Sequence, residues 1–105
     1  MVDWNREFAL EQTGGDEDLL VELLGLFRDS SAGDLEKLRQ AVAAGDSAGV
    51  VRAAHSIKGA AASLGFETVR QLSYEMESEG RSGSVARAQA ELPRLEKLLR
   101  DLPTK

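Results

Sequence analysis

The chain has 105 residues, 42% of them hydrophobic, which is enough for one domain with a modest core. It has no cysteine, so disulfides and a thiol nucleophile are excluded, and its net charge of −5 argues against a general nucleic-acid binder. No apolar run approaches the roughly 18 residues of a membrane span. We therefore expect a single domain over residues 1–105, located in the cytoplasm, that binds neither nucleic acid nor membranes.

Two helices are predicted in the first 44 residues. A short one follows Asp3 or Asn5, either of which can cap it, and Thr13-Gly14-Gly15 ends it. Apolar or small residues then keep one helical register for about six turns, namely Leu20, Leu24, Phe27, Ser31, Leu35, Leu38 and Val42. This pattern predicts one long helix over residues 16–44, with residues 30–33 as its expected weak point.

The next predicted helix covers residues 47–64 and contains the single histidine, His55. Gly45-Asp46 supplies a stop and a cap before it, and Gly65 ends it. Apolar residues recur along it at steps of four and three, at Val50, Ala54, Ile57, Ala61 and Leu64. His55 lies roughly opposite this stripe, so we expect an exposed imidazole.

Two further helices complete the chain. The first covers residues 66–79, residues 80–84 form a loop, and the last helix begins at residue 85. Pro93 predicts a bend in the last helix near residues 89–92. Four amphipathic segments with short connections predict an all-α fold, an antiparallel up-down four-helix bundle with a short extra N-terminal helix.

The residues around His55 suit phosphoryl chemistry. Imidazole is a nucleophile near neutral pH, and Lys58, one turn further on, supplies a positive charge beside it. Gly59 is unfavourable inside a helix by about 1 kcal/mol relative to alanine, which suggests that something approaches this face closely. A single histidine is more often an ordinary surface or core residue. The apolar stripe on the other side of this helix disfavours the core alternative.

A short motif around His55 resembles that of a known family. His55-Ser56-Ile57-Lys58-Gly59, followed by Leu64-Gly65, resembles the His-x-(Leu/Ile)-Lys-Gly-x4-(aliphatic)-Gly signature of histidine-containing phosphotransfer (HPt) domains. Residues 52–59 are also similar to the phosphorylatable N-terminal domain of chemotaxis histidine kinases. Tyr74 departs from that second group, whose members often carry another histidine there.

The resemblance implies a phosphorelay carrier. His55 would accept a phosphoryl group from the aspartate of a receiver domain and pass it to another receiver, with Lys58 beside the transferred group. Glu77, 22 positions after His55, would accept a hydrogen bond from Nδ1–H and leave Nε2 as the nucleophile. The expected docking surface around the histidine consists of Arg52, Val51, Gly59 and Ala62.

The same resemblance defines the expected partners. These are response-regulator receiver domains, a hybrid sensor histidine kinase, or both. The sequence has no P-loop and no glycine-rich kinase signature, so we expect a phosphotransfer intermediate and not an enzyme that uses ATP. No cofactor is expected on the chain itself, because Mg²⁺ would arrive with the receiver. We expect a monomer, and Met1 together with the complete set of helices favours a free-standing protein.

Two other functions fit a helical chain with one histidine. A metal bundle is disfavoured because the sequence contains no Glu-x-x-His unit and no cysteine, so no metal site is predicted. A haem bundle held by His55 is disfavoured because the exposed face beside Lys58 suits haem badly. The other alternative is a structural or adaptor bundle with the HPt fold in which His55 is not phosphorylated.

Overall fold

The structure is a computed structural model that describes residues 3–105, and in this range it contains five helices and no strand. Residues 1 and 2 of the predicted domain lie outside the described part. The helices are α1 (Arg6–Gln12), α2 (Glu17–Ala44), α3 (Ser47–Leu64), α4 (Glu67–Arg81) and α5 (Ala86–Arg100). The all-α fold class predicted from the sequence is therefore confirmed, including the short helix before the long one.

Local sequence signals account for half of the helix ends in the described part of the chain. Asn5, Asp16 and Asp46 each accept a hydrogen bond from the backbone N–H three residues on, at 3.0–3.1 Å, and so begin α1, α2 and α3. Of the two predicted caps for α1, Asn5 is the one used. Gly45 and Gly65 end α2 and α3 in the left-handed conformation, with φ of 65° and 79°.

The expected weak point at residues 30–33 and the proline of the expected bend in the last helix both lie inside continuous helices. α2 runs unbroken through residues 30–33, where the hydroxyls of Ser30 and Ser31 donate to carbonyls three residues earlier in the same helix. α5 continues through Pro93 to Arg100. Gln89, whose carbonyl loses its helical partner to the proline, is exposed, so water can satisfy that carbonyl.

The end of α4 differs from the prediction. Residues 80–84 were expected to form a loop, but α4 continues to Arg81, and the loop is shorter. Gly80 is buried, and a Cβ atom at this position would lie 2.9 Å from Val51 Cγ2 and 3.2 Å from the Ser47 carbonyl oxygen. The prediction was wrong because this glycine serves close packing of α4 against α3 and does not end the helix.

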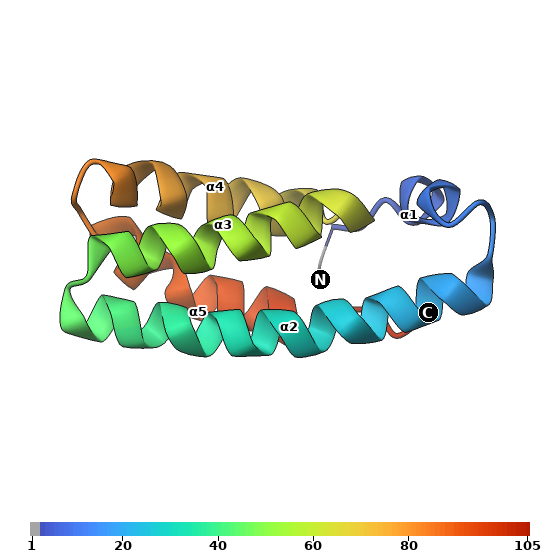
Figure 1. Cartoon of the computed structure of the whole chain (residues 1–105), viewed down its shortest axis with the longest axis horizontal. Coiled ribbons are helices and arrows are strands. Elements are labelled where there is room, and N and C mark those ends of the chain that lie inside the picture. Colours follow the sequence, from blue (N-terminus) through green and yellow to red (C-terminus); the bar gives the residue numbers. More distant parts are fainter. Residues whose placement is uncertain (1–2) are drawn as a thin grey trace.

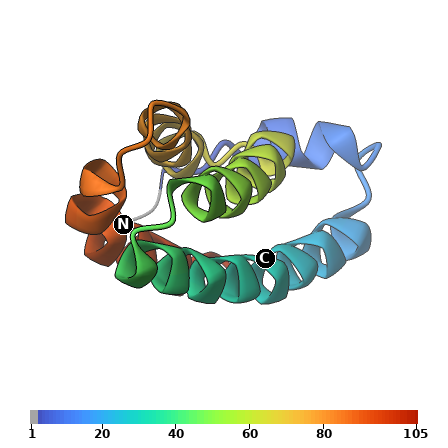
Figure 2. The ribbon, with the colours of Figure 1, turned by 60° about the vertical axis from the view of Figure 1, so that its left-hand side comes forward.

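The four long helices lie alongside one another, and consecutive helices run in alternating directions (Figure 1). α2 and α4 each contact both α3 and α5. α1 lies at the end of the molecule where α3 ends and α2 begins, in contact with both (Figures 1 and 2). Figure 2 also shows α3 and α4 side by side above α2, so that one face of α3 remains uncovered.

An aromatic stack joins the N-terminal segment to the turn between α3 and α4. The buried Phe66 ring stacks on Trp4 and on Phe27, with 5.4 Å between ring centroids in both pairs. The Trp4 indole donates to the Leu64 carbonyl at 2.8 Å. These contacts fix the turn that sets α4 beside α3.

Two alanine substitutions in helices should have opposite effects on stability. Gly33 in α2 has open space around it, so Gly33→Ala should raise the free energy of unfolding by about 0.5–1 kcal/mol. Gly80→Ala should lower it, because the new methyl group meets Val51 and the Ser47 carbonyl. Urea denaturation of the two variants and the wild type measures both changes. An equal gain in stability for both variants would contradict the packing role of Gly80.

Candidate functional site

His55 stands on the uncovered face of α3. The five apolar residues of the predicted stripe on this helix are all buried, as expected from their spacing. The His55 side chain, on the other side of the helix, is 64% exposed. The nucleophile proposed from the sequence is therefore open to a macromolecule that approaches this face.

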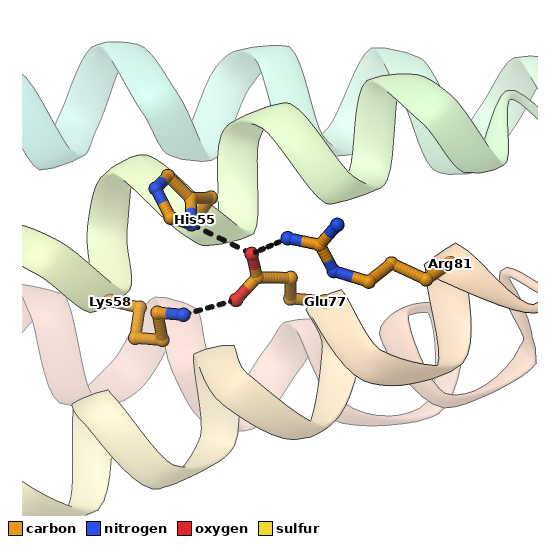
Figure 3. A network of polar contacts seen from close by, with 4 residues as sticks. All are labelled: His55, Lys58, Glu77 and Arg81. Carbon is orange, nitrogen blue, oxygen red and sulfur yellow. Dashed lines mark hydrogen bonds and ion pairs between the residues drawn. The ribbon is translucent and has the colours of Figure 1, made fainter.

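Glu77 on α4 lies beside the ring but away from water, with only 2% of its side chain exposed. His55 Nδ1 lies 2.7 Å from Glu77 Oε2, and Lys58 Nζ lies 2.5 Å from Oε1 (Figure 3). Arg81 Nη2 donates to Oε2 as well, at 2.8 Å. The structure thus brings together all three residues that the sequence placed in the reacting centre, and it adds a fourth.

The ionisation of Glu77 determines which histidine nitrogen carries the proton. Burial raises the pKa of the Glu77 carboxyl, but hydrogen bonds from Lys58, Arg81 and His55 outweigh burial and lower it from 4.5 to about 2. The carboxylate is therefore ionised near neutral pH and only accepts hydrogen bonds. Consequently His55 Nδ1 carries the hydrogen and donates it, and Nε2 of the neutral ring keeps its lone pair.

Arg81 is the member of this cluster that sequence reasoning missed. It was assigned to the loop after α4, whereas it lies in the last turn of that helix, four residues after Glu77. An acidic and a basic residue four apart are neighbours on a helix surface. That spacing could have identified the pair if the helix had been extended past Gly80.

The predicted docking residues occupy different environments on α3. Arg52 is 73% exposed and lies 3.9 Å from Asp46, a loose contact that leaves its charge available. Gly59 and Ala62 are exposed, and there is open space where Gly59 would carry a side chain. Val51 is only partly exposed and lies at the contact with Gly80, so part of it belongs to the helix packing.

A groove of about 550 Å³ runs between α2 and α3 next to this face. Ser56 lines it and donates to Asp34 across the groove at 2.7 Å. His55 lies outside the groove, on an open surface. Small-molecule sites are usually concave and enclose their ligand. The position of His55 therefore suits a protein partner better than a small substrate.

Residues 3–105 contain neither a metal site nor a membrane-spanning helix. In that range, no group of three or more histidine, aspartate or glutamate side chains is arranged to hold a metal ion. None of the helices described there combines the length and the apolar character needed to cross a bilayer.

Comparisons with known proteins point to one family. The sequence model of the Hpt domain matches residues 22–105. Histidine-containing phosphotransfer protein B (HptB) from Pseudomonas aeruginosa PAO1 is 26% identical, with a TM-score of 0.86 over 94% of this chain and 86% of that one. The HPT domain of an Hpt sensor hybrid histidine kinase from Shewanella is 27% identical, with a TM-score of 0.79 and the same coverage. No curated protein sequence matches significantly.

The ion pairs of Glu77 should make the free energy of unfolding depend on pH. Because the pKa of Glu77 is lower in the folded chain, its contribution is complete above about pH 4.5 and is lost as the pH falls towards 2. A shift of this size corresponds to roughly 3 kcal/mol. The free energy of unfolding of the wild type should therefore approach that of Glu77→Gln between pH 5 and pH 2. Urea denaturation across this range tests it, and a constant difference between the two proteins would contradict it.

Proposed function

This chain belongs to the Hpt domain family, and we propose that it is a phosphorelay carrier in which His55 is the phosphorylated residue. Hpt domains are phosphocarriers and not kinases. The observation that carries the assignment to His55 is the contact of 2.7 Å between its Nδ1 and the buried carboxylate of Glu77. This contact orients the ring and leaves the exposed nitrogen Nε2 for the reaction.

The proposed step begins with a receiver domain whose phosphorylated aspartate docks over α3. Nε2 attacks phosphorus in line, the P–N bond forms, and the P–O bond to the aspartate breaks. The aspartate leaves as a carboxylate, and the ring keeps its hydrogen on Nδ1. The ring therefore gains positive charge, which the Glu77 carboxylate stabilises through the same hydrogen bond. The reverse step passes the group to another receiver.

Charge around His55 supports an acidic partner. The chain carries a net charge of −5, yet the cluster beside the histidine holds two cations, Lys58 and Arg81, against one carboxylate. Arg52 adds a further exposed cation on α3. We propose that these charges complement the acidic site of a receiver, which would also bring the Mg²⁺ that the transfer needs. Gly59 and Ala62 would let the partner approach closely.

The proposed site stands on an antiparallel up-down four-helix bundle made of α2 to α5. The alternating helix directions and the contacts between neighbouring helices support this description. Such a frame leaves the outer face of α3 free for receivers or for a hybrid sensor kinase. We propose a protein that acts as a monomer in the cytoplasm, because the site needs no residue from a second copy.

A comparison of phosphoryl transfer to the wild type and to His55→Gln tests this function. Phosphorylated receiver domains from a broad panel, with Mg²⁺, should label the wild type with an acid-labile, base-stable adduct. The His55→Gln variant should take no label, because it lacks the nucleophilic nitrogen, and a matched unfolding curve controls for its fold. Equal labelling of both proteins would contradict the assignment. The absence of any transfer to the wild type would favour the adaptor function.

Glu77 should affect the rate through the orientation of the ring. In the same assay, Glu77→Ala should slow transfer on the order of tenfold or more, because nothing then holds Nδ1–H. Glu77→Gln keeps an acceptor oxygen and should be slowed less. Stability measurements on both variants separate this effect from unfolding. Transfer at the wild-type rate in Glu77→Ala would remove Glu77 from the reaction.

A further inference from the structure

Lys58 must hold its charge near the transferred group, although its side chain is long and flexible. It extends from α3 to α4, and its one ion pair with residues 3–105 is with Oε1 of Glu77. A lysine side chain loses about 2 kcal/mol of rotamer entropy when it is fixed, and an ammonium group has no preferred direction around a single acceptor. One contact therefore restrains the distance of the charge but not its direction.

Tyr74 supplies a second contact from the same side of α4. Its ring centroid lies 5.8 Å from Lys58 Nζ, within the range of a cation–π interaction. Tyr74 precedes Glu77 by three residues, so both project from neighbouring positions on the helix. The ammonium group is thus restrained by an aromatic face and by a carboxylate oxygen.

The two arginines of α4 near this contact are engaged by other partners. Arg70, also on α4, is engaged by Glu67 in two hydrogen bonds. Arg81 occupies the other oxygen of the buried carboxylate. Tyr74 is 48% exposed, more than a side chain needed mainly for the core would be. Its contact with Lys58 is the feature of this side chain that bears on the site.

We propose that Tyr74 is a positioning residue that holds the Lys58 ammonium beside Glu77 and so keeps it available to the phosphoryl group on His55. The inference rests on the proposed function. Without the ring, Lys58 samples more rotamers, and its ammonium group lies beside Glu77 in a smaller fraction of the molecules. An exposed cation–π contact of ordinary strength corresponds to a change of roughly two- to fivefold in rate.

A double-mutant cycle tests this role. Tyr74→Leu removes the aromatic face and keeps an apolar side chain, while Tyr74→Phe keeps the face and removes the hydroxyl. Each is made with Lys58 and with Lys58→Met, and transfer from a phosphorylated receiver is measured over a range of receiver concentrations. The maximal rate should fall about two- to fivefold in Tyr74→Leu. It should stay at the wild-type value in Tyr74→Phe, and Tyr74→Leu should have no further effect in Lys58→Met.

Three results of the cycle would overturn the proposal. One is an equal effect of Tyr74→Leu in both Lys58 backgrounds. Another is a change confined to the receiver concentration at half-maximal rate, which would make Tyr74 a docking contact. The third is a loss in Tyr74→Phe as large as that in Tyr74→Leu, which would assign the effect to the hydroxyl.

Nuclear magnetic resonance of Lys58 separates this inference from the function itself, because it needs no phosphodonor. The ring current of Tyr74 should shift the Lys58 ε-methylene protons upfield in the wild type and in Tyr74→Phe. The shift should disappear in Tyr74→Leu, and the side chain should become more mobile. Lys58 signals that are the same in all three proteins would overturn the proposal, even if no receiver transfers a phosphoryl group to His55.

Discussion

The structure depends on a buried carboxylate that must remain charged. Glu77 is almost fully enclosed, and an isolated ion in such a place would cost several kcal/mol. It is stable as an ion because His55 and Lys58 from α3 and Arg81 from its own helix donate to its two oxygens. Any slip of α4 along α3 would separate the carboxylate from two of these donors. The ion pairs of Glu77 therefore require the same alignment of α3 and α4 that the packing of the two helices produces.

Packing fixes the α3–α4 pair on both sides of that cluster. Near the start of α3, Gly80 lets the helices approach until Val51 lies against its backbone. At the other end, the Gly65 turn and the stack on Phe66 hold the connection. The cluster lies between these two fixed regions. This arrangement separates two requirements, since the orienting carboxylate is kept from water while the ring that it orients faces the solvent and a partner.

Much of the fold and part of the site could be predicted from particular residues. The stripe from Val50 to Leu64 indicated a helix with His55 outside, and the cap Asp46 with the stops Gly45 and Gly65 marked helix ends. These signals are local, because a hydrogen bond to a neighbouring N–H or a spacing of three and four depends only on nearby residues. Helix spacing also placed Lys58 beside His55. Glu77, on another helix, was connected to His55 only through a resemblance to a family.

The sequence by itself determined the helical class, the exposed histidine and the small residues around it, because helix periodicity and capping depend only on residues that are close together in the sequence. Only the tertiary structure decided that Gly80 belongs to a helix, that Arg81 joins the carboxylate, and that Tyr74 lies against Lys58. Arg81 pairs with Glu77 within α4, and only because that helix continues past Gly80. The environment of Gly80 and the contact of Tyr74 with Lys58 depend on the distance and rotation of α4 relative to α3. That geometry arises from the packing of the whole core, which no short stretch of sequence specifies.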